Sequence, residues 1–292
     1  MAFDNKDTSR AAAIERSQKE VLDHSSHEQF YEYYARASQN EKTFARFTAI
    51  RDMLLRVLRD HTRQATVFEV ADIGCGAGTL SILWAESGHR VHGLDVNEPL
   101  LTLAKQRAVE SHYDIDFRLG SATALPWPDG SMDVCMVPEL LEHVAEWETC
   151  LQEFCRVLRP NGILFLTTSN KLCPVQQEFN LPLYSWYPAP IKHKVERLAV
   201  TTRPDLANFA KYPAVNWFSF YGLRRYLSQF GFDSMDRFDV MDTSCKGILA
   251  RMIVLAIRTI PILRFFAHVA TPGTMVVAVK RSPGVNNLTL TG

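Results

Sequence analysis

The sequence predicts an α/β fold, a mostly parallel, doubly wound sheet with helices on both faces. Two observations support this prediction. From residue 66 onward, short apolar runs rich in β-branched residues alternate with amphipathic stretches of helical length. Between the first run and the first stretch, ADIGCGAGTL (71–80) places glycines at three alternating positions. Such a segment is typical of a tight turn that joins a buried strand to a helix.

Each element follows from its local pattern. Helices are expected at 79–87, 99–111, 147–158 and 220–230, and strands at 66–74, 90–95, 115–120, 132–137, 163–168, 233–242 and 274–280. Pro99 suits the first turn of its helix, where the missing N–H costs nothing. Pro160, Asn161 and Gly162 end the helix that begins at Trp147.

The 292 residues contain 32 basic and 32 acidic side chains, a balance that does not indicate a nucleic-acid binder. We divide the chain into an N-terminal helical segment (1–60) and one catalytic domain (61–292). The domain carries a proline- and aromatic-rich insertion at 171–217, expected to cover a substrate, and an apolar, basic insertion at 246–271. Six scattered cysteines form no C-x-x-C pair, so we expect no metal site and a reducing, cytoplasmic location.

The glycine turn predicts a nucleoside site at the carboxyl edge of the sheet, where a helix N-terminus and backbone amides face the ligand. The dinucleotide fingerprint needs a third small residue where Thr79 stands. The observed glycines are instead Gly74, Gly76 and Gly78, in a G-x-G-x-G spacing. The structural alternative is a tight turn without a ligand.

Two carboxylates identify the nucleoside more closely. Asp72 precedes the first glycine and suits a ligand with an ammonium group, whereas it would repel a pyrophosphate. Asp95 ends the second predicted strand, where an acidic residue can accept hydrogen bonds from ribose hydroxyls. A positively charged nucleoside without phosphate matches S-adenosylmethionine.

Four segments carry a family resemblance: ADIGCGAG, GLDVNEPLLTLAKQRA, DVCMVPELLEHV and LRPNGILFLTTSN. They resemble class I S-adenosylmethionine-dependent methyltransferases, and over residues 42–170 they are most similar to the ubiquinone-biosynthesis O-methyltransferase type. The resemblance implies a seven-stranded sheet in the order 3-2-1-4-5-7-6 with an antiparallel seventh strand at 274–280. It ends near residue 170, so it does not identify the methyl acceptor.

The same resemblance implies a set of cofactor contacts. Arg51, in the segment KTFARFTAIR, matches an arginine that approaches the cofactor, and Asp72, Gly76 and Gly78 match the general motif. The other implied positions are Gly74, Asp95, Val96, Asn97, Ser121, Ala122 and Pro138. Many family members have an acidic residue near Ser121, and this chain does not.

Methyl transfer to a hydroxyl benefits from a general base, and PELLEHV supplies the candidates Glu139, Glu142 and His143. His143 is the first choice because its ordinary pKa is near neutral. Glu142 is the second, and His193, in the insertion, is the third. The alternative for His143 is a structural role at the start of a helix.

The predicted function is O-methylation of a small or lipid-like acceptor, such as a quinone or phenol precursor or a lipid-linked saccharide. Two alternatives stay open. One is a nicotinamide-dependent oxidoreductase, and the other is a non-catalytic module that binds S-adenosylmethionine.

The apolar insertion predicts a membrane contact. Residues 248–269 are long enough to span a bilayer, but they contain Arg251, Arg258, Arg264 and Pro261. We therefore expect an amphipathic helix that lies on the inner face of an anionic membrane, with its arginines at the headgroups. The alternative is a helical hairpin packed on the protein itself, or a dimer interface.

Overall fold

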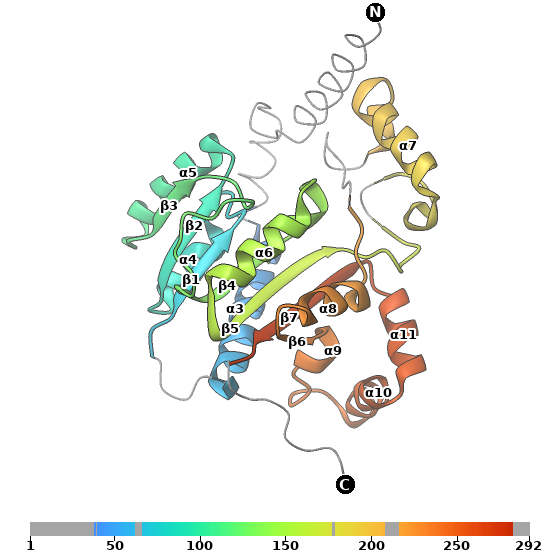
Figure 1. Ribbon diagram of the computed structural model, residues 1–292. Coiled ribbons are helices and arrows are strands. Elements are labelled where there is room, and N and C mark those ends of the chain that lie inside the picture. Colours follow the sequence, from blue (N-terminus) through green and yellow to red (C-terminus); the bar gives the residue numbers. More distant parts are fainter. Residues whose placement is uncertain (1–37, 39, 62–65, 177–178, 208–215, 283–292) are drawn as a thin grey trace, which may run out of the picture.

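The computed structural model describes residues 38, 40–61, 66–176, 179–207 and 216–282 (Figure 1). Most of the predicted N-terminal segment, residues 1–37 and 39, lies outside them. A seven-stranded sheet has the order β3-β2-β1-β4-β5-β7-β6, and β7 runs antiparallel to both of its neighbours. The strands are β1 (Glu69–Ile73), β2 (Arg90–Asp95), β3 (Asp116–Leu119), β4 (Met132–Pro138), β5 (Leu158–Ser169), β6 (Phe232–Met235) and β7 (Gly273–Lys280). This topology confirms the predicted fold class.

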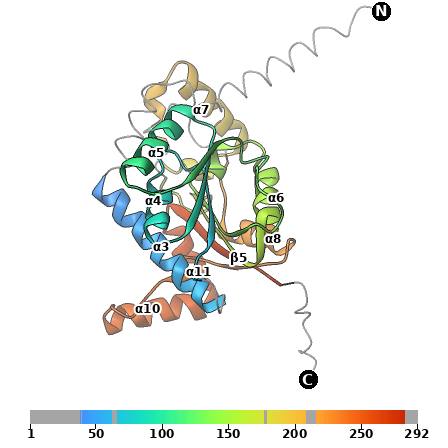
Figure 2. The ribbon, with the colours of Figure 1, turned by 90° about the vertical axis from the view of Figure 1, so that its left-hand side faces the viewer.

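Helices cover both faces of the sheet. On one face, α3 (Glu41–His61) and α4 (Thr79–Glu86) pack around the buried Trp84 and Phe165. On the other face, α6 (Trp147–Val157) and α8 (Phe220–Ser228) bury Phe154 and Phe220. Figure 2 shows these two layers on opposite sides of the sheet. The remaining crossover helix, α5 (Glu98–Glu110), packs its small residues against β3.

The predicted strand at 233–242 is wrong beyond Met235. Asp236 accepts hydrogen bonds from the amides of Phe238 and Asp239, and the Asp239 carboxylate accepts one from the Asp236 amide. This reciprocal capping box begins a short helix, α9 (Arg237–Val240). The two aspartates three residues apart were the sequence signal for it.

β5 begins earlier than predicted. The Pro160–Gly162 segment, expected only to end α6, lies inside the strand, and the pairing with β4 shifts between Met132 and Val134. Asn161 adopts φ 66°, a left-handed conformation that asparagine tolerates better than most residues. The irregularity lets the chain leave α6 and enter β5 without a separate loop.

The insertion after β5 packs largely upon itself. It contains η3 (Tyr184–Trp186), α7 (Ala189–Thr201) and η4 (Pro204–Leu206). The rings of Phe179 and Tyr184 lie 4.1 Å apart at their centroids, and both are buried. These aromatic side chains therefore form a small core of their own, and the predicted substrate-covering role of the insertion stays a prediction.

The apolar insertion is a helical hairpin, not the single helix expected. α10 (Ile248–Thr259) and α11 (Pro261–Val269) pack against each other, and Pro261 begins the second helix (Figure 1). Among the described residues, no helix combines the length and apolar character needed to cross a membrane. The placement of Arg258 and Arg264 also differs from the expectation. Arg258 donates to the carbonyl groups of Phe238 and Met241, while Arg264 pairs with Asp236 and Asp239.

The hairpin is anchored through Asp236, which is fully buried. Its Oδ2 accepts from Arg264 Nε at 2.7 Å and from His268 Nε2 at 2.8 Å. Burial alone would raise the pKa of Asp236, but the hydrogen bonds from His268 and Arg264 outweigh it and lower this pKa to about 2. The lowered pKa means that folding favours the ionised carboxylate.

We predict that Asp236→Asn lowers the free energy of unfolding by about 3–5 kcal/mol at pH 7, because the variant removes the fully buried carboxylate that pairs with Arg264 and accepts from His268. In the wild type, the contribution of Asp236 is complete above its ordinary pKa of 3.8 and is lost as the pH falls toward 2. Urea titrations between pH 2 and 7 measure both effects. Asp233→Asn, which breaks an exposed pair with Arg281, is the matched control and should cost at most about 1 kcal/mol.

Candidate active site

The glycine loop joins β1 to α4 in left-handed conformations. Gly74, Gly76 and Gly78 have φ values of 77°, 51° and 76°, which favour glycine at all three positions. A Cβ atom on Gly78 would lie 2.9 Å from the Cβ of Ala104, and one on Gly74 would lie 3.2 Å from Cδ1 of Leu140. The loop is therefore held closely between α5 and the segment that follows β4.

Asp95, at the end of β2, organises this loop. Its Oδ2 accepts from the Gly76 amide at 2.7 Å, and its Oδ1 accepts from the Asn97 amide at 2.8 Å. Burial raises the pKa of Asp95, and the hydrogen bonds from the Asn97 and Gly76 amides offset part of that effect. Each carboxylate oxygen keeps the capacity for a second hydrogen bond, which two vicinal ribose hydroxyls would use.

Asp72 lies beneath the loop with 1% of its surface exposed. Its Oδ2 accepts from Ser81 Oγ at 2.6 Å, whereas its buried Oδ1 has no donor among the residues described by the structure. Burial raises the pKa of Asp72 to about 7, although the Ser81 hydrogen bond lowers it. A buried acceptor that lacks a donor fits the ammonium group of S-adenosylmethionine.

We predict opposite effects of Asp72→Asn on stability and on cofactor affinity. The folded pKa of about 7 lies above the ordinary 3.8, so wild-type stability falls as the pH rises between these values. The ligand-free variant should therefore be more stable at pH 8, by up to about 4 kcal/mol, and unchanged near pH 4. Its affinity for S-adenosylmethionine should fall about 10–100-fold, because a charge-assisted hydrogen bond is lost.

Thermal melts and calorimetric titrations at pH 6 and pH 8 test both parts. The wild-type affinity should increase between these pH values more steeply than that of the variant, since only the wild type has a carboxyl group at position 72, with a pKa of about 7. Equal pH dependence in the two proteins would contradict the ammonium contact.

The predicted adenine end is only partly available to a ligand. Val96 is 52% exposed and Ser121 is also exposed. Asn97 is buried, and its side chain caps α5 by accepting from the Leu100 amide at 3.0 Å. Ala122 is buried as well. Val96 and Ser121 thus present side chains at this end, whereas the side chains of Asn97 and Ala122 serve the fold.

The structure does not bring Arg51 to the cofactor edge. Its side chain pairs with Asp52 and donates weakly to the carbonyl of Leu83, beyond the first turn of α4. Arg46, five residues earlier in α3, lies at the carboxyl edge of the sheet instead, where it forms a salt bridge of 2.7 Å with Glu139, just after β4. The position of Arg51 therefore gives no support to its predicted cofactor contact, and a motif match without helical phase does not show which side chain faces the sheet edge.

A cavity of about 800 Å³ opens beside the glycine loop. It is lined by α3, by the carboxyl ends of β4 and β5, by the start of β7, by α9 and by residues 241–242 after α9. Leu140, which touches Gly74, stands between two of its lining segments, so the loop and the cavity are adjacent. Pro138, Glu142 and His143 all line the cavity, and Glu142 is buried.

Charged and apolar groups share this cavity. Glu139 adopts φ 53° and pairs with Arg46 at the rim, an unusual backbone conformation of the kind that clusters at functional sites. Arg237 also lines the cavity and donates to the Gly273 carbonyl at 2.6 Å. Burial lowers the pKa of Arg237. Met53 and Met241 supply apolar surface, so the cavity suits an acceptor with both polar and apolar parts.

His193, the third candidate base, lies elsewhere. It is an exposed residue of α7, pairs with Glu196 at 3.2 Å and does not line the cavity. Its predicted role as a base is therefore not supported by its position.

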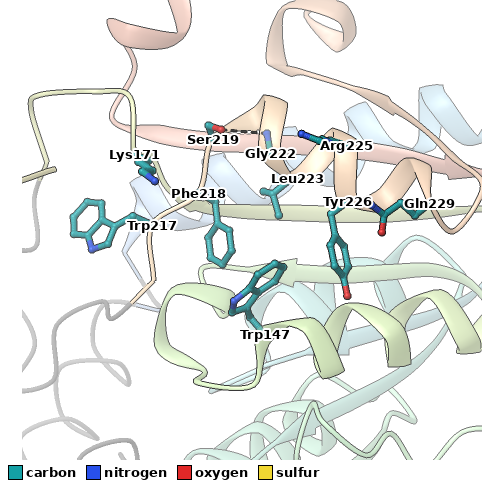
Figure 3. A pocket seen from close by; sticks show the side chains of 10 residues that line it. All are labelled: Trp147, Lys171, Trp217, Phe218, Ser219, Gly222, Leu223, Arg225, Tyr226 and Gln229. Atoms are coloured by element: carbon teal, nitrogen blue, oxygen red, sulfur yellow. Dashed lines mark hydrogen bonds between the residues drawn. The ribbon is translucent and has the colours of Figure 1, made fainter. Parts of the chain in front are cut away.

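A smaller pocket of about 300 Å³ lies between α6 and α8 (Figure 3). The ring of Trp147 contacts those of Phe218 and Tyr226, each at a centroid distance of 5.2 Å. None of its ten lining residues is acidic or a histidine, so this pocket offers no carboxylate or imidazole as a general base. The larger cavity is the better candidate for the acceptor.

Comparison with known proteins adds to this geometry. Residues 71–166 match a family model described as a methyltransferase domain. The chain is 35% identical over 100 residues to malonyl-[acyl-carrier protein] O-methyltransferase of Serratia marcescens, which covers 34% of this chain and 38% of that protein. It is 33% identical over 129 residues to ubiquinone biosynthesis O-methyltransferase of Mesorhizobium japonicum, with coverages of 43% and 52%. The alignments thus span about half the length of these relatives, or less.

Among solved structures, the PH0226 protein of Pyrococcus horikoshii shares the fold with a TM-score of 0.50 and 15% identity, covering 84% of this chain and 93% of that one. The sequence match includes the glycine loop, Asp95 and the PELLEHV segment. The strand order and the antiparallel β7 agree with the topology that the resemblance implies. Residues 71–166 thus match a methyltransferase domain, and the sheet that contains them has the strand order implied by the resemblance to class I, S-adenosylmethionine-dependent methyltransferases.

Proposed function

We propose that this chain is an S-adenosylmethionine-dependent methyltransferase that acts on an oxygen of a lipid-like or small amphiphilic acceptor, with residues 61–292 as its catalytic domain. The observation that carries the proposal is the adjacency of the glycine loop to the 800 Å³ cavity. Leu140, which packs beside Gly74, directly follows Pro138 and Glu139, which line the cavity. Asp72 and Asp95 would hold the ammonium and ribose groups of the cofactor. Gly74, Gly76 and Gly78 would let the backbone approach it.

Val96, Ser121 and Pro138 complete the proposed cofactor site. Val96 and Ser121 are exposed where β2 and β3 end, and the Gly120 amide bonds to the Asp95 carbonyl at 3.0 Å, which joins these two strand ends. Pro138 lines the cavity at the end of β4. The cofactor would therefore lie along the carboxyl edge from β3 to β4.

When bound, S-adenosylmethionine supplies a methyl group on a sulfonium, which is already an excellent leaving group. The work left to the protein is to orient the acceptor, exclude water and remove a proton. His143 is the proposed base, since it lines the cavity directly after the glycine-loop contact at Leu140. It would accept the acceptor's hydroxyl proton. Glu142, buried beside it, is the second candidate.

The acceptor class rests on the lining of the cavity. Both charged side chains (arginines and carboxylates) and apolar methionines line it. This combination suits an acceptor with a polar head and an apolar tail. A quinone or phenol precursor and a lipid-linked saccharide both have this character. The two relatives named above are O-methyltransferases by name, which supports oxygen as the methylated atom.

For its location, we propose the cytoplasm, in peripheral contact with the inner face of the membrane. Six free cysteines, five of them buried, suit a reducing compartment. A lipid-like acceptor would be collected at a membrane surface.

Two measurements test the proposed activity. Isothermal titration should show binding of S-adenosylmethionine and none of NAD or NADP, and the reverse result would favour the oxidoreductase. Incubation with methyl-labelled cofactor and a membrane lipid extract should then yield a labelled, base-stable lipid whose mass increases by about 14 Da. Cofactor binding without any labelled product in soluble or lipid fractions would favour a non-catalytic module.

A further inference from the structure

α10 directs its apolar side chains outward. Its large hydrophobic residues Ile248, Leu249, Met252, Ile253 and Leu255 are each more than half exposed. At about 100° per residue they occupy one continuous side of the helix. The opposite side carries the buried Val254 and the inward-facing Arg258. This is the reverse of the usual arrangement in a surface helix, where polar groups face water.

α11 extends the same exposed apolar surface. Ile262, Leu263, Phe265 and Phe266 are exposed to 59%, 41%, 40% and 59%, while Arg264 and His268 turn toward Asp236. Since the two helices pack against each other, nine large apolar side chains gather on one hairpin. Soluble monomers rarely expose apolar patches of this kind, which mark sites of interaction.

Two arginines of the hairpin, Arg258 and Arg264, point toward the protein, so their charges do not oppose insertion of the outward face into lipid. A charged arginine near the centre of a membrane-inserted helix costs about 2.5–3.5 kcal/mol. Here Arg258 is held by carbonyl groups after β6 and Arg264 by two carboxylates. Neither side chain therefore belongs to the outward face, and the exposed Arg251, which donates to the carbonyl groups of Thr243 and Ser244, lies at the edge of that face.

The surrounding charge suits an anionic leaflet. Residues 243–292 contain no Asp or Glu, and Lys246 and Arg251 are exposed at the start of α10. Each basic residue near an anionic surface contributes modest attraction, and no acidic residue of this segment opposes it. Charge complementarity therefore favours an anionic partner, and the large exposed apolar face favours the lipid of an anionic membrane as that partner.

Both ends of the hairpin are connected in the chain to residues that line the proposed acceptor cavity. Met241 and Asp242, just before it, and Pro272 and Gly273, just after it, all line the cavity. Figure 1 shows α10 and α11 projecting from the body of the protein beside α9. A lipid bilayer covering the hairpin would thus lie next to the cavity mouth, where an amphiphilic acceptor would enter.

We propose that the α10–α11 hairpin inserts its apolar face into the lipid of an anionic membrane, chiefly by hydrophobic burial, and so places the cavity at the bilayer surface. This inference rests on the lipid-like acceptor proposed above. It replaces the electrostatic docking expected from the sequence, because two of the three arginines face the protein.

Sedimentation with vesicles of phosphatidylcholine and phosphatidylglycerol tests the hairpin, using the full chain and two charge-insertion variants. Leu249→Glu with Ile262→Glu should weaken vesicle binding on the order of a hundredfold, about tenfold for each carboxylate forced into the interface. Both side chains are exposed, so the fold should survive, which a thermal melt verifies. Val109→Glu on α5, a hydrophobic residue with the same 73% exposure as Leu249, is the matched control and should bind as the wild type does.

Salt and oligomeric state separate the alternatives. Binding should persist in 0.5 M salt with only a few-fold loss, since few basic residues contribute. Failure of the wild type to bind these vesicles, or undiminished binding by the double variant, would overturn the inference. So would a wild-type dimer in light scattering that the double variant dissociates without any vesicle binding, because the face would then be an interface between copies. Cofactor titration on the same samples reports separately on the proposed function.

Discussion

His143→Ala is expected to lower the methyl-transfer rate by about 10²–10⁴-fold while the affinity for S-adenosylmethionine changes little, because a general base contributes roughly this factor. The structure places His143 on the lining of the 800 Å³ cavity proposed for the acceptor, three residues after Leu140, which packs beside Gly74. Single-turnover rates with labelled cofactor, measured beside calorimetric affinities, separate chemistry from binding.

Two further variants locate the base. His193→Ala is the control, since His193 is exposed on α7 and does not line the cavity, and it should leave the rate unchanged. Glu142→Gln keeps the shape of the side chain and removes its charge. If Glu142→Gln causes the large loss and His143→Ala only weakens cofactor binding, the assignment of the base passes to Glu142.

Asp95→Ala should weaken the binding of S-adenosylmethionine on the order of 10²–10⁴-fold. Two charge-assisted hydrogen bonds to the ribose would disappear, and each contributes about 1.5–3 kcal/mol. The change also removes the acceptor for the Gly76 and Asn97 amides, so the glycine loop loses a tether as well. Isothermal titration at constant pH and salt measures the effect.

The controls for Asp95 distinguish ligand contact from loop stability. Asp95→Asn keeps one acceptor oxygen and should show an intermediate loss, whereas Asp205→Ala, at an exposed pair with Arg203, should show none. An affinity equal to that of the wild type in Asp95→Ala would reject the cofactor site as a whole, because every other proposed contact is arranged around this residue.

Local patterns in the sequence were sufficient for much of the fold. The three glycines with left-handed φ values and the strand end at Asp95 were predictable, and the bounds of β4 and α5 lie within one residue of the expected 132–137 and 99–111, since backbone sterics and hydrophobic periodicity act over a few residues. The strand order followed from the family resemblance and agrees with the structure. The cavity-lining positions of Glu142 and His143 follow from their place just beyond the fourth strand.

Side-chain direction was decided only by the tertiary structure. Arg46 rather than Arg51 reaches the carboxyl edge, because this depends on how α3 is rotated against the sheet. Asp236 meets His268 across 32 positions of sequence, a contact that no local pattern contains. That contact and the Arg264 pair turn the polar side of the hairpin inward. A helix pattern specifies two faces, but only long-range packing selects which of them meets the protein and which remains outside.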